Sequence, residues 1–99
     1  MSETIINSAV IRTQAETLSN LNVQFQSQVN QLRNLEASLN SSWDGDARRA
    51  FHNAFESDMV QMDNFYKAIN TYVSALMNAA ARYEEAERNN VDIATTRSY

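Results

Sequence analysis

Apolar side chains recur at helical spacing along the first half of the chain. A series with seven-residue spacing is flanked by further apolar positions: Ile11, Leu18, Leu21, Phe25, Val29, Leu32, Leu35 and Leu39. This pattern predicts one amphipathic helix over about residues 8–40, with a single buried stripe. Asn7 is placed to be its N-cap, and Ile6 and Ile11 occupy the positions of a hydrophobic staple.

The second half of the chain carries a similar but wider apolar stripe. It predicts a helix over about residues 47–88, and we expect its dimer or core contacts from Phe51, Phe55, Met62, Phe65, Ile69, Tyr72 and Leu76. One partner helix cannot cover so broad a face, so this helix is expected to pack against more than the first helix. Beyond Glu87 the pattern stops, and we expect residues 89–99 to be a flexible tail.

A single joint, SSWDGDARRAF at residues 41–51, lies between the two helices. It contains the only glycine and the only tryptophan of a chain that has no proline. We expect a turn over about residues 41–46, in which Gly45 supplies a backbone angle that other residues resist. Asp44 and Asp46 place negative charge where the dipole of the next helix favours it. Trp43 is expected to fold over the end of the apolar seam.

The predicted fold class is all-α, an antiparallel helical hairpin that forms one domain over residues 1–99. Two helices alone have too little core to be stable in most cases. Two hairpins that pair into a four-helix bundle would bury both stripes. We therefore predict a dimer, whose partner is either a second copy or a related chain.

The composition of the chain limits the kinds of partner that we expect. The net charge of -4 argues against a nucleic-acid partner or anionic lipid, because neutralising phosphates needs clustered Lys and Arg. No stretch approaches the length of an apolar membrane span, so stable membrane insertion is not expected. The first residues lack the basic region followed by a long apolar run that a signal peptide has, so no conventional signal peptide is expected.

Little catalytic chemistry is available. The chain has one histidine, His52, and no cysteine, which removes most pairs of nucleophile and base. A di-iron bundle would need Glu-x-x-His, but Arg49 stands three residues before His52. We expect His52 to be a surface or boundary residue, and we predict no enzyme activity, no cofactor and no metal.

The end of the second helix is unusual because it is acidic. Glu84, Glu85 and Glu87 lie where the helix dipole disfavours negative charge. Tyr83 and Glu87 are four residues apart and share one face. Hairpin geometry places this face beyond the start of the first helix, as an overhang. The alternative is an ordinary solvated charge run with Tyr83 packed against Ile5 or Ile6.

These motifs resemble the WXG (Trp-x-Gly) family of ESAT-like substrates of type VII secretion, over nearly the whole chain. Trp43, Asp44 and Gly45 form the Trp-x-Gly motif, followed by a small and an aromatic residue, Ala47 and Phe51. Tyr83 and Glu87 match the family's C-terminal Tyr-x-x-x-Asp/Glu export motif.

The resemblance implies export of a folded dimer through a membrane complex with an ATPase of FtsK/SpoIIIE type. Trp43 and Gly45 of one subunit would lie near Tyr83 and Glu87 of the other, as a composite secretion and recognition signal. It also implies a virulence-associated protein of a Gram-positive bacterium, secreted by a leaderless route after a transient cytoplasmic stage. Because both motifs lie on one chain, a homodimer would be self-sufficient, while a heterodimer with a relative is the alternative.

The leading functional hypothesis is a secreted dimeric effector or helper that acts by protein–protein contact. The alternative is a cytosolic adaptor or chaperone that carries a larger toxin to the same export machine. A third hypothesis is a membrane-active amphipathic protein. The negative net charge argues against it, because helices that bind membrane surfaces usually carry basic polar faces.

Overall fold

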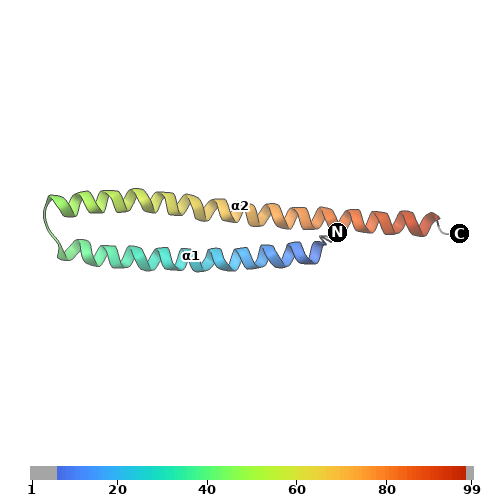
Figure 1. The fold of residues 1–99 in the computed structure, drawn as a ribbon, viewed down its shortest axis with the longest axis horizontal. Helices are drawn as coiled ribbons and strands as arrows, with labels where there is room; N and C mark the ends of the chain where they lie inside the picture. Colours follow the sequence, from blue (N-terminus) through green and yellow to red (C-terminus); the bar gives the residue numbers. More distant parts are fainter. Residues whose placement is uncertain (1–6, 98–99) are drawn as a thin grey trace, which may run out of the picture.

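The computed structural model describes residues 7–97, with side chains described through residue 89. Two helices, α1 (Ser8–Ser42) and α2 (Asp46–Arg97), lie side by side and antiparallel, joined by a short turn (Figure 1). The hairpin is a rod with principal extents of 83 × 24 × 15 Å. The predicted all-α hairpin is confirmed. Among the described residues, no helix is both long and apolar enough to cross a membrane.

The start of α1 is fixed by its cap. Asn7 has an extended backbone, and its side-chain oxygen accepts a hydrogen bond from the backbone N–H of Val10 at 2.9 Å. This bond satisfies one of the N–H groups that the first turn of a helix leaves without a partner. The predicted N-cap is therefore confirmed. Ile6, the expected staple partner of Ile11, lies outside the described residues.

The turn depends on two backbone features. Trp43 is extended and ends α1, and Gly45 has a φ of +103°, the one positive φ among the described residues. Side chains with a Cβ resist this region, so glycine is required for conformational reasons. The carbonyl of Gly45 then accepts from the N–H of Arg49 at 3.3 Å, and Asp46 contributes negative charge to the first turn of α2.

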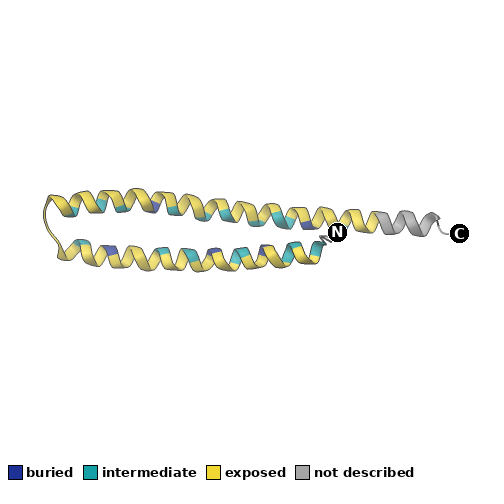
Figure 2. Cartoon of the chain, in the orientation of Figure 1, coloured by how far each residue is buried: buried dark blue, intermediate teal, exposed yellow. Residues whose placement is uncertain are grey.

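The seam between the helices has a thin apolar core. Burial is confined to the facing sides of the two ribbons (Figure 2). Only Ala15, Met59 and Ala80 are buried apolar side chains in the described part of the chain. The two alanines lie toward the open end of the hairpin, and Met59 lies nearer the turn. Such a core is small for a chain of this length.

Two polar side chains are buried in the same seam. Asn22 donates to the backbone carbonyl of Tyr66 and to the side-chain oxygen of Asn70, both at 3.0 Å. Glu36, only 6% exposed, faces His52 across the seam. A buried Asn between helices fixes their register, because a shifted pairing would leave its amide without partners. The sequence pattern did not reveal either position, since both stand between apolar neighbours.

The seven-residue series on α1 is only partly in the seam, which corrects the expected single buried stripe. Ile11, Leu18 and Phe25 are half-buried, but Leu32 and Leu39 are exposed. In a straight helix a seven-residue repeat drifts by about 20° per heptad, so its later members turn away from the partner. Glu36 and Asn40 take the seam positions toward the turn instead.

The expected end of the second helix near residue 88 is also corrected, because α2 continues to Arg97. The segment that follows Glu87 contains no glycine and no proline, so nothing in it stops the propagation of the helix. As a result α2 extends well past the start of α1 (Figure 1). This overhang begins after Glu84, which is bonded to Arg12 of α1, and so later than the expected start at Tyr83.

Replacing Gly45 with valine should destabilise the hairpin by about 1–2 kcal/mol, the usual cost of a left-handed backbone for a residue with a Cβ. A Cβ at this position would meet no atom within 4 Å, so the cost comes from the backbone angle and not from a clash. Thermal melts followed by circular dichroism measure it. Gly45→Asn is the control, since Asn tolerates positive φ better, and equal melts for Gly45→Val and wild type would contradict the requirement.

Candidate functional site

One face of the hairpin is apolar and uncovered. Large apolar side chains occupy the same flank of both helices: Val10, Leu21, Leu32, Leu35, Leu39, Phe51, Phe65, Tyr72 and Tyr83, all exposed. At 100° per residue these positions lie to one side of the seam on each helix, and antiparallel pairing of two right-handed helices brings both flanks to the same side. Phe25 and Phe65 meet edge to face across the helices, with ring centroids 5.4 Å apart, and mark the middle of this face. We call it the apolar face.

The predicted stripe of α2 divides between the seam and the apolar face. Phe55, Met62, Ile69 and Leu76 are half-buried against or beside α1, whereas Phe51, Phe65 and Tyr72 are exposed. Tyr72 remains 63% exposed and Phe65 54% exposed. The expectation that one helix cannot cover this stripe therefore agrees with the arrangement of the single chain.

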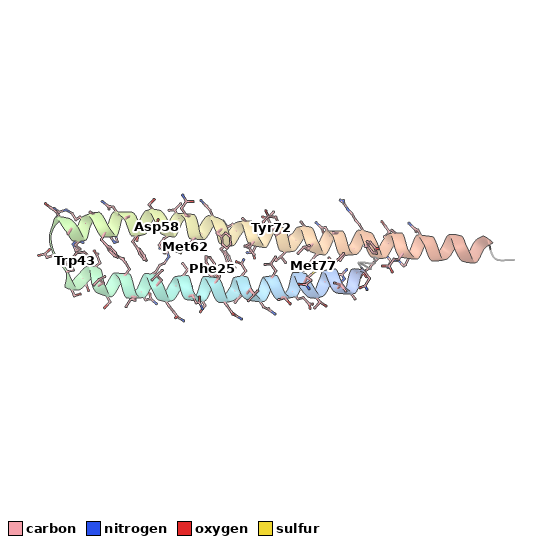
Figure 3. All side chains as sticks on the ribbon, viewed as in Figure 1. Phe25, Trp43, Asp58, Met62, Tyr72 and Met77 are labelled. Carbon is pink, nitrogen blue, oxygen red and sulfur yellow. The ribbon has the colours of Figure 1, made fainter. Side chains whose placement is uncertain are left out.

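At the turn, Trp43 packs on the aromatic start of α2. Its ring lies 5.8 Å from that of Phe51, which in turn stacks on Phe55 at 6.4 Å. Trp43 nevertheless stays 38% exposed at the tip of the hairpin, between the helix ends (Figure 3). Beneath it is an open, largely polar hollow of about 410 Å³, lined by Asn40, Ser41, Ser42, Trp43, Asp44 and Arg48.

The two arginines at the start of α2 each have a nearby partner. Arg48 donates to the side-chain oxygen of Asn40 at 2.7 Å, across the turn, and Arg49 forms an ion pair with Asp46. The unfavourable placement of these cations in a first helical turn is therefore offset locally.

At the opposite end of the rod, Arg12 and Glu84 clamp the helices together. The guanidinium donates two hydrogen bonds to the carboxylate, from Nε at 2.9 Å and from Nη2 at 2.8 Å. The bond from Arg12 holds the pKa of the Glu84 carboxyl below its usual value. Arg12 of α1 therefore binds this carboxylate, while the neighbouring side chains of Tyr83 and Glu87 remain exposed.

The four residues of the expected composite signal are not together within one chain. Trp43 and Gly45 lie at the turn, and Tyr83 and Glu87 lie about 60 Å away along α2, given the helical rise per residue. A single hairpin therefore presents two separate half-surfaces, one at each end.

A polar cluster near the turn was not predicted from the sequence. His52 is half-buried, as expected for a boundary residue, and its Nδ1 lies 2.8 Å from Oε2 of the buried Glu36. Glu56 lies close to both. Sequence spacing could not reveal this cluster, because Glu36 is contributed by the other helix.

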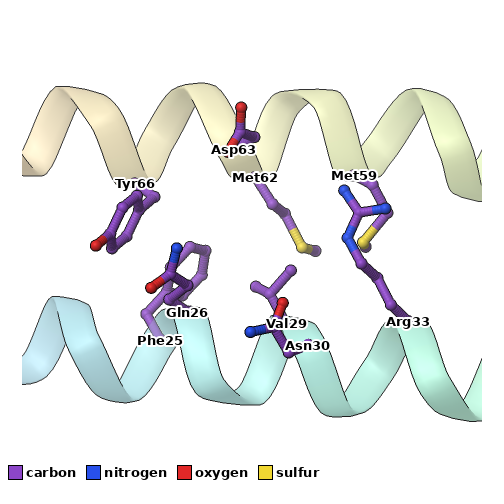
Figure 4. A pocket seen from close by; sticks show the side chains of 9 residues that line it. All are labelled: Phe25, Gln26, Val29, Asn30, Arg33, Met59, Met62, Asp63 and Tyr66. Atoms are coloured by element: carbon purple, nitrogen blue, oxygen red, sulfur yellow. The ribbon is translucent and has the colours of Figure 1, made fainter.

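The cavity in the middle of the seam is small. It has a volume of about 50 Å³ and is lined by Phe25, Val29, Met59, Met62 and Tyr66 together with the polar side chains of Gln26, Asn30, Arg33 and Asp63 (Figure 4). Organic cofactors need pockets of roughly 300–1,000 Å³. A second hollow of about 160 Å³, between Phe25, Leu32 and Met62, opens on the apolar face. This location suits the insertion of an apolar side chain from a protein partner.

Comparison with known proteins agrees with this architecture. Two crystal structures of the secreted protein EsxB from Bacillus anthracis str. Sterne have the same fold. One has a TM-score of 0.77 and 22% identity, over 88% of this chain and 99% of that chain. The other, a mutant of EsxB, has a TM-score of 0.73 and 21% identity, over 100% and 99% of the two chains. No curated protein matches the sequence.

A family model described as proteins of 100 residues with WXG matches residues 3–88. The matched segment contains all of α1, the Trp43–Gly45 turn and most of α2. The chain therefore belongs to the WXG100 family.

Proposed function

We propose that this protein is a substrate of a type VII secretion system, exported as an antiparallel dimer and acting by protein–protein contact. The observation that carries the proposal is the apolar face, which is flanked by the two half-surfaces of the export signal at opposite ends of the rod. Membership of the WXG100 family and likeness in fold to EsxB, a secreted protein, support it.

The apolar face calls for a partner of similar length and chemistry. Exposed Leu, Phe and Tyr side chains follow both helices over most of the hairpin, which a water-soluble monomer rarely tolerates. A second copy offers the same face, and a two-fold axis makes one surface self-complementary. Pairing of two hairpins then gives a four-helix bundle. A related chain with the same stripe is the alternative partner.

An antiparallel arrangement of the two hairpins is favoured by the overhang of α2. A two-fold axis across the middle of the apolar face, near Phe25 and Phe65, places the turn of one copy beside the open end of the other. Tyr83, which α1 leaves exposed, then gains a covering partner. Trp43 and Gly45 of one copy approach Tyr83 and Glu87 of the next, so each end of the bundle carries a complete signal.

In this proposal the ATPase of the secretion complex, of FtsK/SpoIIIE type, reads a folded surface. Trp43 offers an exposed aromatic side chain and Glu87 offers an exposed charge. Neither feature is needed for the seam. After a cytoplasmic stage the dimer leaves the cell, and no catalytic step is part of its role.

Tyr72→Glu should weaken the dimer by more than about tenfold in dissociation constant, because the interface would bury an unpaired charge. Sedimentation equilibrium should give a mass near twice 11.2 kDa for wild type and a lower average for the variant. Val60→Glu is the matched control: Val60 is also exposed, but lies about 120° from Tyr72 around the helix, off the apolar face. A monomeric wild type, or equal loss in both variants, would contradict dimerisation through the apolar face.

Glu87→Gln should reduce export while leaving the fold intact. Glu87 is exposed and lies well before the end of α2 at Arg97, so its charge contributes little to stability. The measurements are the secreted fraction, with and without the export ATPase, and the melting temperature. Glu85→Gln removes a neighbouring exposed charge as a control. If Glu87→Gln is secreted normally, its carboxylate is an ordinary solvated charge, and wild type that stays in the cell would favour the adaptor alternative.

Glu84→Gln should lower the melting temperature at neutral pH. Since the folded state depresses the pKa of Glu84, its contribution is present above the ordinary value of 4.5 and disappears as the pH falls through the lower folded value. The difference in melting temperature from wild type should therefore shrink below about pH 4.5. A gap that is the same at pH 3 and pH 7 would show that charge pairing with Arg12 is not its origin.

A further inference from the structure

Three side chains with metal-binding atoms meet near the turn. Glu36 comes from α1, and His52 and Glu56 come from α2. Each offers one ligand atom, and these atoms all lie within 4.8 Å of one another. His52 and Glu56 are four residues apart, so they project from the same face of α2. Glu36 completes the group from the opposite side of the seam.

The geometry of one pair already suits a metal. Nδ1 of His52 and Oε2 of Glu36 are 2.8 Å apart. In a tetrahedral site with bonds of about 2.0–2.2 Å, adjacent ligand atoms are roughly 3.4 Å apart, so this pair must separate by roughly half an ångström to admit an ion. Glu56 is exposed and can adjust its rotamer to supply the third ligand.

The burial of Glu36 favours a divalent cation, which stabilises a carboxylate more than a single hydrogen bond does. Its carboxylate is only 6% exposed, and among the described residues it is hydrogen-bonded to His52. A buried carboxylate loses much of its hydration, which a divalent ion restores more fully than an imidazole N–H. A simple His–Glu pair would also leave the convergence of Glu56 without a role.

We propose that Glu36, His52 and Glu56 bind a first-row divalent transition ion such as Zn²⁺, which links α1 to α2 beside the turn. One imidazole and two carboxylates suit Zn²⁺ better than Mg²⁺, which prefers oxygen ligands alone. Water completes the coordination on the outer side.

The site remains open in the proposed dimer. Phe51 lies on the apolar face, and His52, the next residue, points about 100° away around the helix. Glu56 lies further in the same direction, on the opposite side of the seam from Phe65 and Tyr72. A partner on the apolar face therefore leaves the three ligands uncovered. The inference does not depend on secretion or on dimerisation.

Titration of the full-length, chelator-treated chain with Zn²⁺ in a calorimeter tests the proposal. We expect one ion per chain and a melting temperature raised by several degrees, because the ion binds the folded hairpin in preference to the unfolded chain. Co²⁺ should give the visible absorption of a nitrogen- and oxygen-ligated ion. Mg²⁺ at the same concentration should produce neither effect.

Variants of the proposed ligands test whether Zn²⁺ binds at this cluster. Glu56→Gln should weaken Zn²⁺ more than about tenfold and leave the fold unchanged, since Glu56 is exposed. His52→Gln keeps a donor for Glu36 but removes the imidazole, and should weaken binding by at least as much. Circular dichroism checks that both variants are folded.

Glu85→Gln is the matched control. It removes one carboxylate from the acidic end of α2 and should bind Zn²⁺ as wild type does. The proposal is overturned if wild type binds no Zn²⁺, if Mg²⁺ binds equally well, or if Glu56→Gln and His52→Gln keep full affinity. Loss of binding in Glu85→Gln alone would assign the ion to the acidic segment around Glu85 instead.

Discussion

The structure depends on the fact that two helices can cover only one side of each other. The seam buries a few small or flexible apolar groups, Ala15, Met59 and Ala80, and leaves the rest of each apolar stripe in contact with water. The hydrophobic effect scales with the area removed from water, so this seam supplies only part of what the sequence offers. The remaining stripe is the surface on which we propose that a partner packs.

Polar groups compensate for the thin seam by fixing its register. Apolar contacts alone allow two long helices to slide, because one Leu or Met can replace another with little loss. Asn22 with Asn70, and Arg12 with Glu84, make bonds that only one alignment satisfies. They lie at different heights along the rod, so together they hold the helices in one register.

This register in turn decides which residues are left on the apolar face. Sliding by one turn would move Phe65 away from Phe25 and interrupt the continuous face that a partner needs. Interactions inside the hairpin therefore also determine its outer surface. The same constraint brings Glu36 opposite His52, across the seam, and so assembles the polar cluster near the turn.

Much of the fold could be predicted from the sequence, because period, caps and the single glycine are local signals. Asn7, Gly45 and the two long amphipathic segments were recognised from neighbours within a few positions. The exposed Leu32 and Leu39 were not, because the heptad drift of a straight helix becomes visible only over several turns. The helix beyond Glu87 is not predicted, because the amphipathic pattern ends there. The helix continues nevertheless, since the segment contains no glycine or proline to end it.

For the candidate site, the sequence predicted the parts but not their arrangement. Trp43, Gly45, Tyr83 and Glu87 could be recognised as motifs, yet only the rod shows that they lie at opposite ends of one chain. The cluster of Glu36, His52 and Glu56 was invisible, since its members belong to two helices and their meeting depends on the register. Which residues of α1 and α2 meet across the seam cannot be deduced from the order of residues in the sequence.

The separation of the two motifs gives the dimer a further physical consequence. If the export machine reads Trp43 and Gly45 together with Tyr83 and Glu87, a lone hairpin shows it only half of a signal at each end. Assembly on the apolar face then completes the signal, so recognition is coupled to burial of the hydrophobic surface. A chain that has not paired would expose apolar side chains and at the same time fail to be recognised. In the proposed dimer, this coupling follows from the length of the rod, which is set by two uninterrupted helices and one glycine turn.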